Sequence, residues 1–216
     1  MDRRQQGQLN EAIDGALREP SPAHFEVVVA AGRGLSRATV AEKVRQRATL
    51  LGRREPAIAS SLLATREALI FSVYAAAAPR GWYCGWCDGS SLRREGSRRA
   101  GIGGILLDPL QRPADEFADP IGDLGPLEAE IAALIRLLAI ALRRGVQRLR
   151  VHTDSSAVSH LWARQRRDAR LAPVVDLAGR LRAFRLQRIP RQHNLSAHRL
   201  ARRAALQGRS IASQGD

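Results

Sequence analysis

Four short segments carry side chains that could bind divalent metal ions. In chain order they are WCDGSS, LEAEIAAL, RVHTDSSAV and HNLSAHRLA, which supply Asp88, Glu130, Asp154 and His198. Hard cations such as Mg²⁺ prefer oxygen ligands and take few from the protein, the rest coming from water and substrate phosphate. Two such ions about 3.5–4 Å apart suit in-line cleavage of a phosphodiester. The four side chains therefore predict a site for two Mg²⁺ or Mn²⁺ ions.

The strands predicted before Asp88 and Asp154 would bring the two carboxylates together. The aromatic-rich stretch Trp82–Asp88 is typical of a strand, which we expect to end at Asp88. Gln147–Thr153 alternates apolar residues and predicts a second strand, which Asp154 terminates. Neighbouring strands lie about 4.8 Å apart, so the two aspartates could share an ion if their strands pair. Without a cation they would repel each other and raise at least one pKa.

A strong helix is predicted over Glu128–Arg143, and its first turn contains two acids. Glu128 and Glu130 are two residues apart, so they point in different directions on a helix. The apolar neighbours Ile131 and Leu134 place Glu130 on the side of the sheet. Glu128 is better interpreted as a favourable charge at the helix N-terminus.

The remaining pattern predicts a helical N-terminal region followed by an α/β domain. The boundary is expected at Pro79-Arg80-Gly81, which gives regions 1–78 and 79–216. Helices are expected over Leu9–Leu17, from Pro22 after the cap Ser21 to a stop at Gly32 or Gly34, from the cap Ser36 to Gly52, and over Ala57–Ala78, Ser155–Ala163, Pro173–Ala183 and Leu195–Leu206. Further strands are expected over Ala100–Leu107, within Gln111–Asp119 and over Phe184–Ile189.

The four segments, with RRAGIGGILLDP after the first, resemble the ribonuclease H family, particularly its short bacterial and plant type. The resemblance spans roughly residues 80–205. It implies an α/β fold with a mixed five-stranded sheet flanked by helices. It also implies a metal-dependent endonuclease that hydrolyses the RNA strand of RNA–DNA hybrids. The catalytic metal ligands would be Asp88, Glu130, Asp154 and the residue at position 198, and the family's AE pair favours Glu130 over Glu128.

His198 stands where the family has its last aspartate. Imidazole suits Mn²⁺ or Zn²⁺ better than Mg²⁺, which prefers oxygen. The histidine could hold the second ion, position water or shuttle a proton. The alternatives are a weakened site or an exposed helix residue without a role.

The charge of the chain predicts a polyanionic partner. The formal net charge is +14, with 35 basic residues against 21 acidic ones. Between Arg164 and Arg203, arginines greatly outnumber the two acids Asp168 and Asp176. An RNA–DNA hybrid, the partner that the resemblance implies, carries the negative charge that this positive chain would attract.

Particular residues are expected to contact that nucleic acid. Gly89 and Ser90, which should turn the chain after Asp88, would offer backbone amides. One helix is expected to carry Arg164, Arg166, Arg167 and Arg170 along the phosphates, although a solvated charged face would have the same pattern. Arg191 and Asn194, just before the closing helix, complete the set, and Asn194 is also its expected N-cap.

Several other classes of protein are disfavoured. Cys84 and Cys87 lie three apart on a predicted strand and face opposite sides, which argues against a zinc site or a disulfide. No long uninterrupted apolar run and no signal-peptide pattern occurs, so we expect a cytoplasmic protein without a membrane span. No small-molecule cofactor is expected, and the sequence carries no signal for an oligomeric state.

Three other functions remain open. A hybrid-binding module without catalysis would bind hybrids and show no metal-dependent cleavage. A resolvase-like nuclease of the same superfamily would cut DNA junctions in preference to hybrids. A DNA-binding regulator would bind duplex DNA through residues 1–78, where GLSRATVAEKVRQRAT is similar to a helix-turn-helix.

Overall fold

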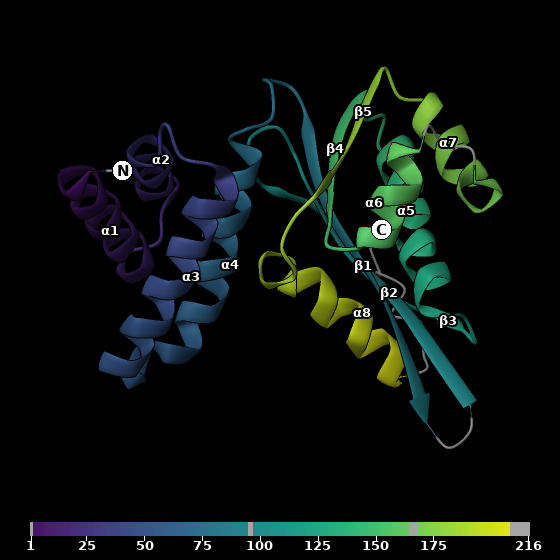
Figure 1. Cartoon of the computed structure of the whole chain (residues 1–216), viewed down its shortest axis with the longest axis horizontal. Coiled ribbons are helices and arrows are strands. Elements are labelled where there is room, and N and C mark those ends of the chain that lie inside the picture. The colour runs from purple at the N-terminus through teal and green to yellow at the C-terminus, as the bar shows by residue number, and fades with distance from the viewer. Residues whose placement is uncertain (1, 95–96, 165–167, 208–216) are drawn as a thin grey trace. The chain divides into compact units, whose positions relative to one another are not determined.

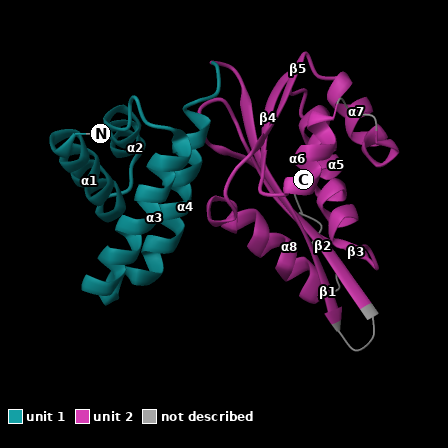
Figure 2. Cartoon of the chain, in the orientation of Figure 1, with its two compact units in different colours: residues 1–79 teal, residues 80–216 magenta. Residues whose placement is uncertain are grey.

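The chain forms two compact units, residues 1–79 and residues 80–216 (Figure 2). The computed structural model describes residues 2–94, 97–164 and 168–207. The expected Arg166 and Arg167 contacts therefore lie outside the described residues.

The first unit is helical, as predicted. Its helices are α1 (Arg3–Arg18), α2 (Pro22–Ala31), α3 (Arg37–Arg54) and α4 (Ala59–Ala75), with the 3₁₀ turn η1 (Pro56–Ile58) before α4. Both expected caps are present: Ser21 Oγ accepts the N–H of His24, and Ser36 Oγ accepts that of Thr39.

The expected stop of α3 at Gly52 is wrong. The helix continues to Arg54, and Glu55, the residue before Pro56, leaves the helical conformation. A residue that precedes proline is disfavoured in the α region, so Pro56 ends the helix. A glycine inside a helix lowers helix stability by only about 1 kcal/mol relative to alanine, so Gly52 alone does not end α3.

One stretch of the described residues, Pro56–Ala75, is long and apolar enough to cross a membrane by length and composition. Of its 18-residue window, 44% is buried. Core helices of soluble proteins pass the same test, so this is weak evidence for a span. The absence of a membrane span stays a prediction.

The second unit is a mixed five-stranded sheet flanked by helices, which confirms the predicted fold class. Its elements are β1 (Tyr83–Arg94), β2 (Ser97–Leu107), β3 (Pro113–Gly122), α5 (Pro126–Arg143), β4 (Arg148–Thr153), α6 (Ser156–Ala163), η2 (Ala169–Leu171), α7 (Ala172–Gly179), β5 (Ala183–Arg188), η3 (Arg191–His193) and α8 (Leu195–Gln207). The strand order is β3-β2-β1-β4-β5 (Figure 1). The β1–β2 and β2–β3 pairs are antiparallel, and β1–β4 and β4–β5 are parallel.

Two predicted boundaries in this unit are wrong. Strand β1 does not end at Asp88 but continues to Arg94, because its second half pairs with β2 as far as Ser97. The predicted helix Pro173–Ala183 ends at Gly179, and Ala183 begins β5 beside β4.

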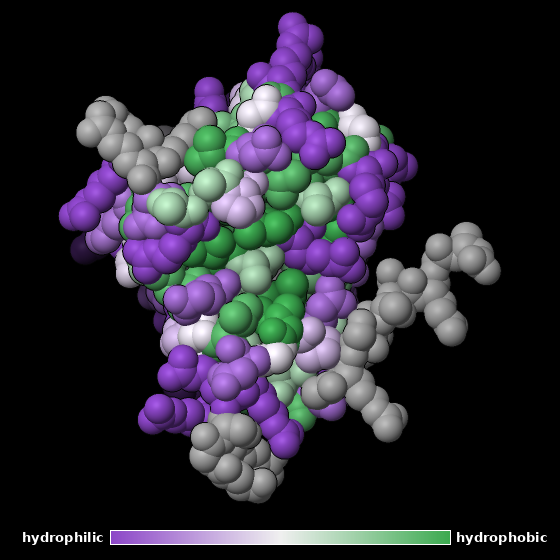
Figure 3. Space-filling model, turned by 90° about the vertical axis from the view of Figure 1, so that its right-hand side faces the viewer, coloured by the Kyte–Doolittle hydropathy of each residue, from purple (hydrophilic) through white to green (hydrophobic). Residues whose placement is uncertain are grey.

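Helices cover both faces of the sheet. On one face α5 packs Leu134, Leu137 and Leu138 into the core, together with Leu149 and Val151 of β4. Seen from the side of α5 and α7, an apolar band runs between polar margins (Figure 3). Helix α8 lies on the opposite face, against β1, β2 and β3.

The contact between α8 and β2 depends on glycine. A Cβ atom at Gly103 would lie 2.4 Å from the backbone nitrogen of Ala201 and 2.5 Å from Cβ of Leu200. Gly103→Ala should therefore lower the free energy of unfolding by about 1–3 kcal/mol, the usual cost of overpacking. Urea denaturation measures the change.

Gly179→Ala is the matched control. A Cβ atom there meets nothing within 4 Å, and alanine favours a helix, so this variant should unfold at the parent urea concentration or somewhat above it. Equal midpoints for the two variants would contradict the close packing of α8 on β2.

Candidate active site

Asp88 and Asp154 lie beside each other on neighbouring parallel strands. The β1–β4 register pairs Trp86 with His152, and each aspartate comes two residues later in its own chain. Side chains alternate between the faces of a strand, so both carboxylates lie on the side of α8. Asp88 is only 3% exposed. The pairing of strands on which a shared site depends is therefore present.

Glu130 reaches the same place from the other side of the sheet. Gly89 of β1 has the backbone of α5 against it: a Cβ atom there would lie 2.2 Å from the carbonyl carbon of Ala129 and 2.3 Å from the nitrogen of Glu130. The Gly89 N–H donates to Glu130 Oε2 at 3.3 Å. Glu128, in contrast, is exposed. Glu130 lies one residue beyond the first turn of α5, in which it was expected, but on the predicted side.

His198 of α8 contacts the aspartate of β1. Its Nδ1 lies 2.8 Å from Asp88 Oδ2, and its Nε2 lies 3.2 Å from Nη2 of Arg191. A guanidinium only donates, so Nε2 accepts and Nδ1–H donates to Asp88 in a neutral ring. This tautomer follows from the hydrogen-bond network. Both ring nitrogens are thus engaged by protein groups.

Asn194 connects β1 with Asp154, the residue that follows β4. It is fully buried, and its Nδ2 donates to the carbonyl of Cys87 at 3.0 Å and to Asp154 Oδ1 at 2.6 Å. The expected contact of Asn194 with nucleic acid therefore does not fit its position. Its side chain holds β1 and Asp154 together.

Burial and mutual repulsion raise the pKa values of two of these acids. The pKa of Glu130 rises to about 9, chiefly because of burial and then because of the charges of Asp88 and Asp154. The pKa of Asp88 is also raised, by burial first and then by Asp154, while His198 and Arg191 oppose the shift. The site is short of positive charge even with Arg191 beside it.

The donor set suits a hard divalent cation. Three carboxylates that repel one another lose that repulsion when a cation binds. Within the described residues, no three Asp, Glu, His or Cys side chains already form a metal-binding group. Instead, the three carboxylates accept hydrogen bonds: Asp88 from His198, Asp154 from Asn194, and Glu130 from the Gly89 amide. A carboxylate has about four lone-pair sites, so these bonds leave sites on each acid that an ion can use.

Arg191 makes a contact within the site that the sequence did not reveal. It was expected at the nucleic acid, but its guanidinium lies against His198 and its charge acts on Asp88 and Glu130. It is also exposed, so it can reach solvent and a ligand. The only signal of this contact in the sequence is the position of Arg191 shortly before the closing helix.

The other predicted nucleic-acid contacts lie at different places. Gly89 and Ser90 belong to β1 instead of a turn, and Ser90 is 7% exposed. Arg164 is exposed just after the end of α6. Arg170 does not share its helix, because it lies in η2 and pairs with Asp168 at 2.7 Å. The expected arginine helix is therefore wrong over its described part.

The two cysteines are buried free thiols, as expected. Burial raises the pKa of Cys84 to about 11 and that of Cys87 well above its usual range. Both are therefore neutral and poorly nucleophilic at physiological pH.

Comparison with known proteins shows which families and folds the second unit resembles. Residues 87–204 match the family model described as reverse transcriptase-like. The N-terminal ribonuclease H domain of a Mycobacterium tuberculosis protein matches with a TM-score of 0.53 and 26% identity, over 59% of this chain and 98% of that one. A search of curated protein sequences found no match.

Two further solved structures show the same fold. Ribonuclease H1 from Halobacterium salinarum has a TM-score of 0.52 and 23% identity, over 57% of this chain and 97% of that one. LC11-RNase H1, isolated from compost and solved with an RNA/DNA hybrid, has a TM-score of 0.52 and 21% identity, over 58% and 98%.

Asn194→Ala tests whether the buried amide holds the site together. Both of its hydrogen bonds would be removed, and buried groups left without partners cost about 1–3 kcal/mol each. The free energy of unfolding should fall by at least that amount in urea denaturation. Asn194→Asp should cost more, because it adds a carboxylate beside Asp154. Parent-like stability of Asn194→Ala would show that these bonds contribute nothing.

Proposed function

Since the chain belongs to the reverse transcriptase-like family and has the ribonuclease H fold, we propose that it hydrolyses the RNA strand of RNA–DNA hybrids with two divalent metal ions. The observation that carries the proposal is the meeting of Asp88, Glu130 and Asp154 from two strands and a helix. The relative LC11-RNase H1 was solved with such a hybrid, which supports the substrate class.

The buried cluster of acids lowers the stability of the fold, and a function at this site would explain why the chain carries it. Because the pKa of Glu130 is raised from 4.5 to about 9, the fold loses stability as the pH rises through that range, where the unfolded chain is ionised and the folded one is not. A purely structural core would place apolar groups there instead. Such perturbed carboxylates are typical of functional sites.

The three acids would hold the ions, with Asp88 and Asp154 on one face and Glu130 beside Gly89. When bound, Mg²⁺ or Mn²⁺ supplies Lewis acidity, which activates water and stabilises the charge of the leaving oxygen. Asn194 fixes Asp154, and the Gly89 amide orients Glu130. Arg191, exposed next to these groups, can attract a phosphate to the site.

His198 has two possible roles in this proposal. Through Nδ1–H it orients the carboxylate of Asp88. Through Nε2 it would act as the predicted metal ligand once Arg191 turns away toward a phosphate. A substrate phosphate that draws Arg191 to itself would thus free Nε2 of His198 from its contact with the guanidinium.

One observation favours a second function, a hybrid-binding module without catalysis. The chain has His198 where the ribonuclease H family has its last aspartate, so the site has one negative charge fewer with which to hold ions. A labelled hybrid incubated with Mg²⁺ or Mn²⁺, beside single-stranded RNA, duplex RNA and duplex DNA, separates the two functions. Metal-dependent cleavage of the hybrid's RNA strand supports the enzyme, whereas binding without cleavage supports the module.

Asp88→Asn and Glu130→Gln should each reduce the cleavage rate by about 100-fold or more, equal to roughly 2.7 kcal/mol of barrier. Each removes a ligand charge and keeps the shape of the side chain. Glu128→Gln is the control, because Glu128 is exposed outside the cluster. Single-turnover rates measure the effect, and equal losses at Glu128 and Glu130 would refute the assignment on α5.

Substitution at His198 should change the metal preference. A neutral imidazole gives the site less negative charge than an aspartate and favours softer ions, so the parent should prefer Mn²⁺ to Mg²⁺ at limiting concentration. His198→Asp should shift the preference toward Mg²⁺, and His198→Ala should raise the metal concentration for half-maximal rate. Calorimetric titration of each ion gives an independent measure.

If His198→Ala matches the parent at every concentration of both ions, His198 is not a ligand. Its contact with Asp88 would then only orient the carboxylate.

A further inference from the structure

The face of the sheet that holds Asp154 becomes cationic toward the start of the strands. Side chains alternate along β4, so Arg148, Arg150 and His152 share the face of Asp154. At about 3.3 Å per residue, Arg150 lies roughly 13 Å from Asp154. The arginines therefore lie beyond the acidic cluster, on the same surface of the sheet.

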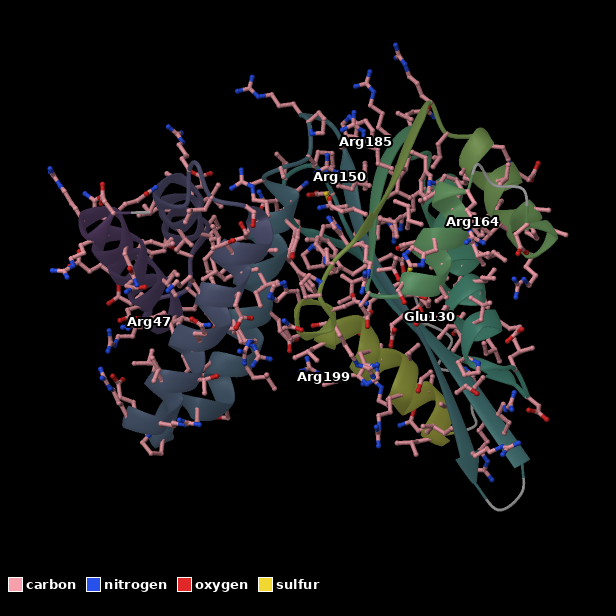
Figure 4. All side chains as sticks on the ribbon, viewed as in Figure 1. Arg47, Glu130, Arg150, Arg164, Arg185 and Arg199 are labelled. Atoms are coloured by element: carbon pink, nitrogen blue, oxygen red, sulfur yellow. The ribbon has the colours of Figure 1, made fainter. Side chains whose placement is uncertain are left out.

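Two arginines stand side by side on neighbouring strands. Arg150 of β4 and Arg185 of β5 are register partners in a parallel pair, and Figure 4 shows them together, away from Glu130. Arg185 is exposed, whereas Arg150 is only 7% exposed. Burial lowers the pKa of Arg150, and the charge of Arg185 lowers it further. Cys84, opposite Arg150 on β1, opposes this lowering of the pKa of Arg150, but it is itself a neutral thiol at physiological pH.

Four other arginines of this unit are neutralised by acids. Ion pairs join Arg112 to Asp108, Arg136 to Asp119, Arg144 to Asp115 and Arg170 to Asp168. Among the described residues, none of the ion pairs involves Arg148, Arg150 or Arg185. These three arginines thus add positive charge without an ion-pair partner among the described acids at this end of β4 and β5, as other arginines do elsewhere in this unit.

An aromatic ring completes the surface. The guanidinium carbon of Arg185 lies 5.2 Å from the ring centroid of Trp82, a cation–π contact. Trp82 comes just before β1 and is partly exposed. Guanidinium groups bind phosphate, and aromatic rings stack on bases that are not held in a duplex. The combination suits a single strand better than a duplex, whose bases are already stacked.

We propose that Trp82, Arg148, Arg150 and Arg185, the β4–β5 arginine patch, bind a single-stranded nucleic-acid segment that extends from the hybrid. The choice of a hybrid as the adjoining duplex rests on the proposed function. In this arrangement Arg185 and Trp82 contact the strand, and Arg150 adds fixed positive charge behind them. Substrates with a single-stranded tail should therefore bind more tightly than blunt hybrids.

The test uses the full chain carrying Asp88→Asn, in metal-free buffer, so that no substrate is cut. Fluorescence anisotropy compares a blunt hybrid, the same hybrid with a short single-stranded tail, and the tail alone. The tail should tighten binding by about fivefold or more, the lower range for stacking of one base on an aromatic ring. Arg185→Gln or Trp82→Leu should remove most of that gain and leave the affinity for the blunt hybrid nearly unchanged.

Arg144→Gln is the matched control, because it removes the same charge from an arginine that is paired with Asp115. It should leave the gain from the tail intact. The log–log salt dependence of tail binding should flatten by about 0.7 for each arginine–phosphate pair that a substitution removes, the value for single strands. Arg185→Lys, which keeps the charge but not the planar fork, should retain part of the gain.

Equal affinity for tailed and blunt hybrids would overturn the proposal, as would equal losses in Arg185→Gln and Arg144→Gln. Displacement of the tail by inorganic polyphosphate, together with no effect of Trp82→Leu, would reveal a general anion surface and also overturn it. Cleavage by the unsubstituted chain is measured separately. Hybrid cleavage without a tail effect refutes only this inference, whereas tail binding without cleavage refutes only the proposed activity.

Discussion

Helix backbones can touch the central strands only where those strands have no side chain, and the candidate site depends on that constraint. Gly89 lets the start of α5 lie against β1, and Gly103 lets α8 lie against β2 from the opposite face. One helix delivers Glu130 and the other delivers His198. A larger residue at either glycine would push a helix outward and separate these groups from Asp88. The site is thus assembled by packing across both faces of one sheet.

The electrostatics of the site follow from this packing. Burial places Asp88 and Glu130 where their charges are poorly solvated, and Asp154 adds repulsion. The positive charge of Arg191 offsets only part of this cost, because both pKa values remain raised. At the far end of the same strands the imbalance is reversed: Arg150 lies buried beside Arg185, and neither is in an ion pair with any described acid. Acids are therefore in excess at one end of these strands, and arginines are in excess at the other end.

Local signals predicted the fold and the acidic residues better than they predicted contacts. The caps at Ser21 and Ser36 are local hydrogen bonds, so sequence alone located them. The prediction ended strand β1 at Asp88 because glycine and serine usually indicate a turn. In the structure, pairing with β2 keeps these residues in the strand. The apolar spacing of α5 was enough to choose Glu130. The buried bonds of Asn194 join residues distant in sequence, and the contact of Arg191 with His198 joins η3 to α8. No periodic pattern in the sequence indicates either contact.

The two open edges of the sheet differ in character. Strand β3 forms one edge and contains Pro113 and Pro120, which have no N–H to donate, and its Asp115 and Asp119 are tied to α5 and the residue after it by ion pairs. Charged and proline-bearing edges resist the addition of a strand from another molecule. Strand β5 forms the other edge, where Arg185 and Arg188 bring like charges that would repel the same edge of a second copy. The order of the strands therefore also protects the protein from edge-to-edge aggregation.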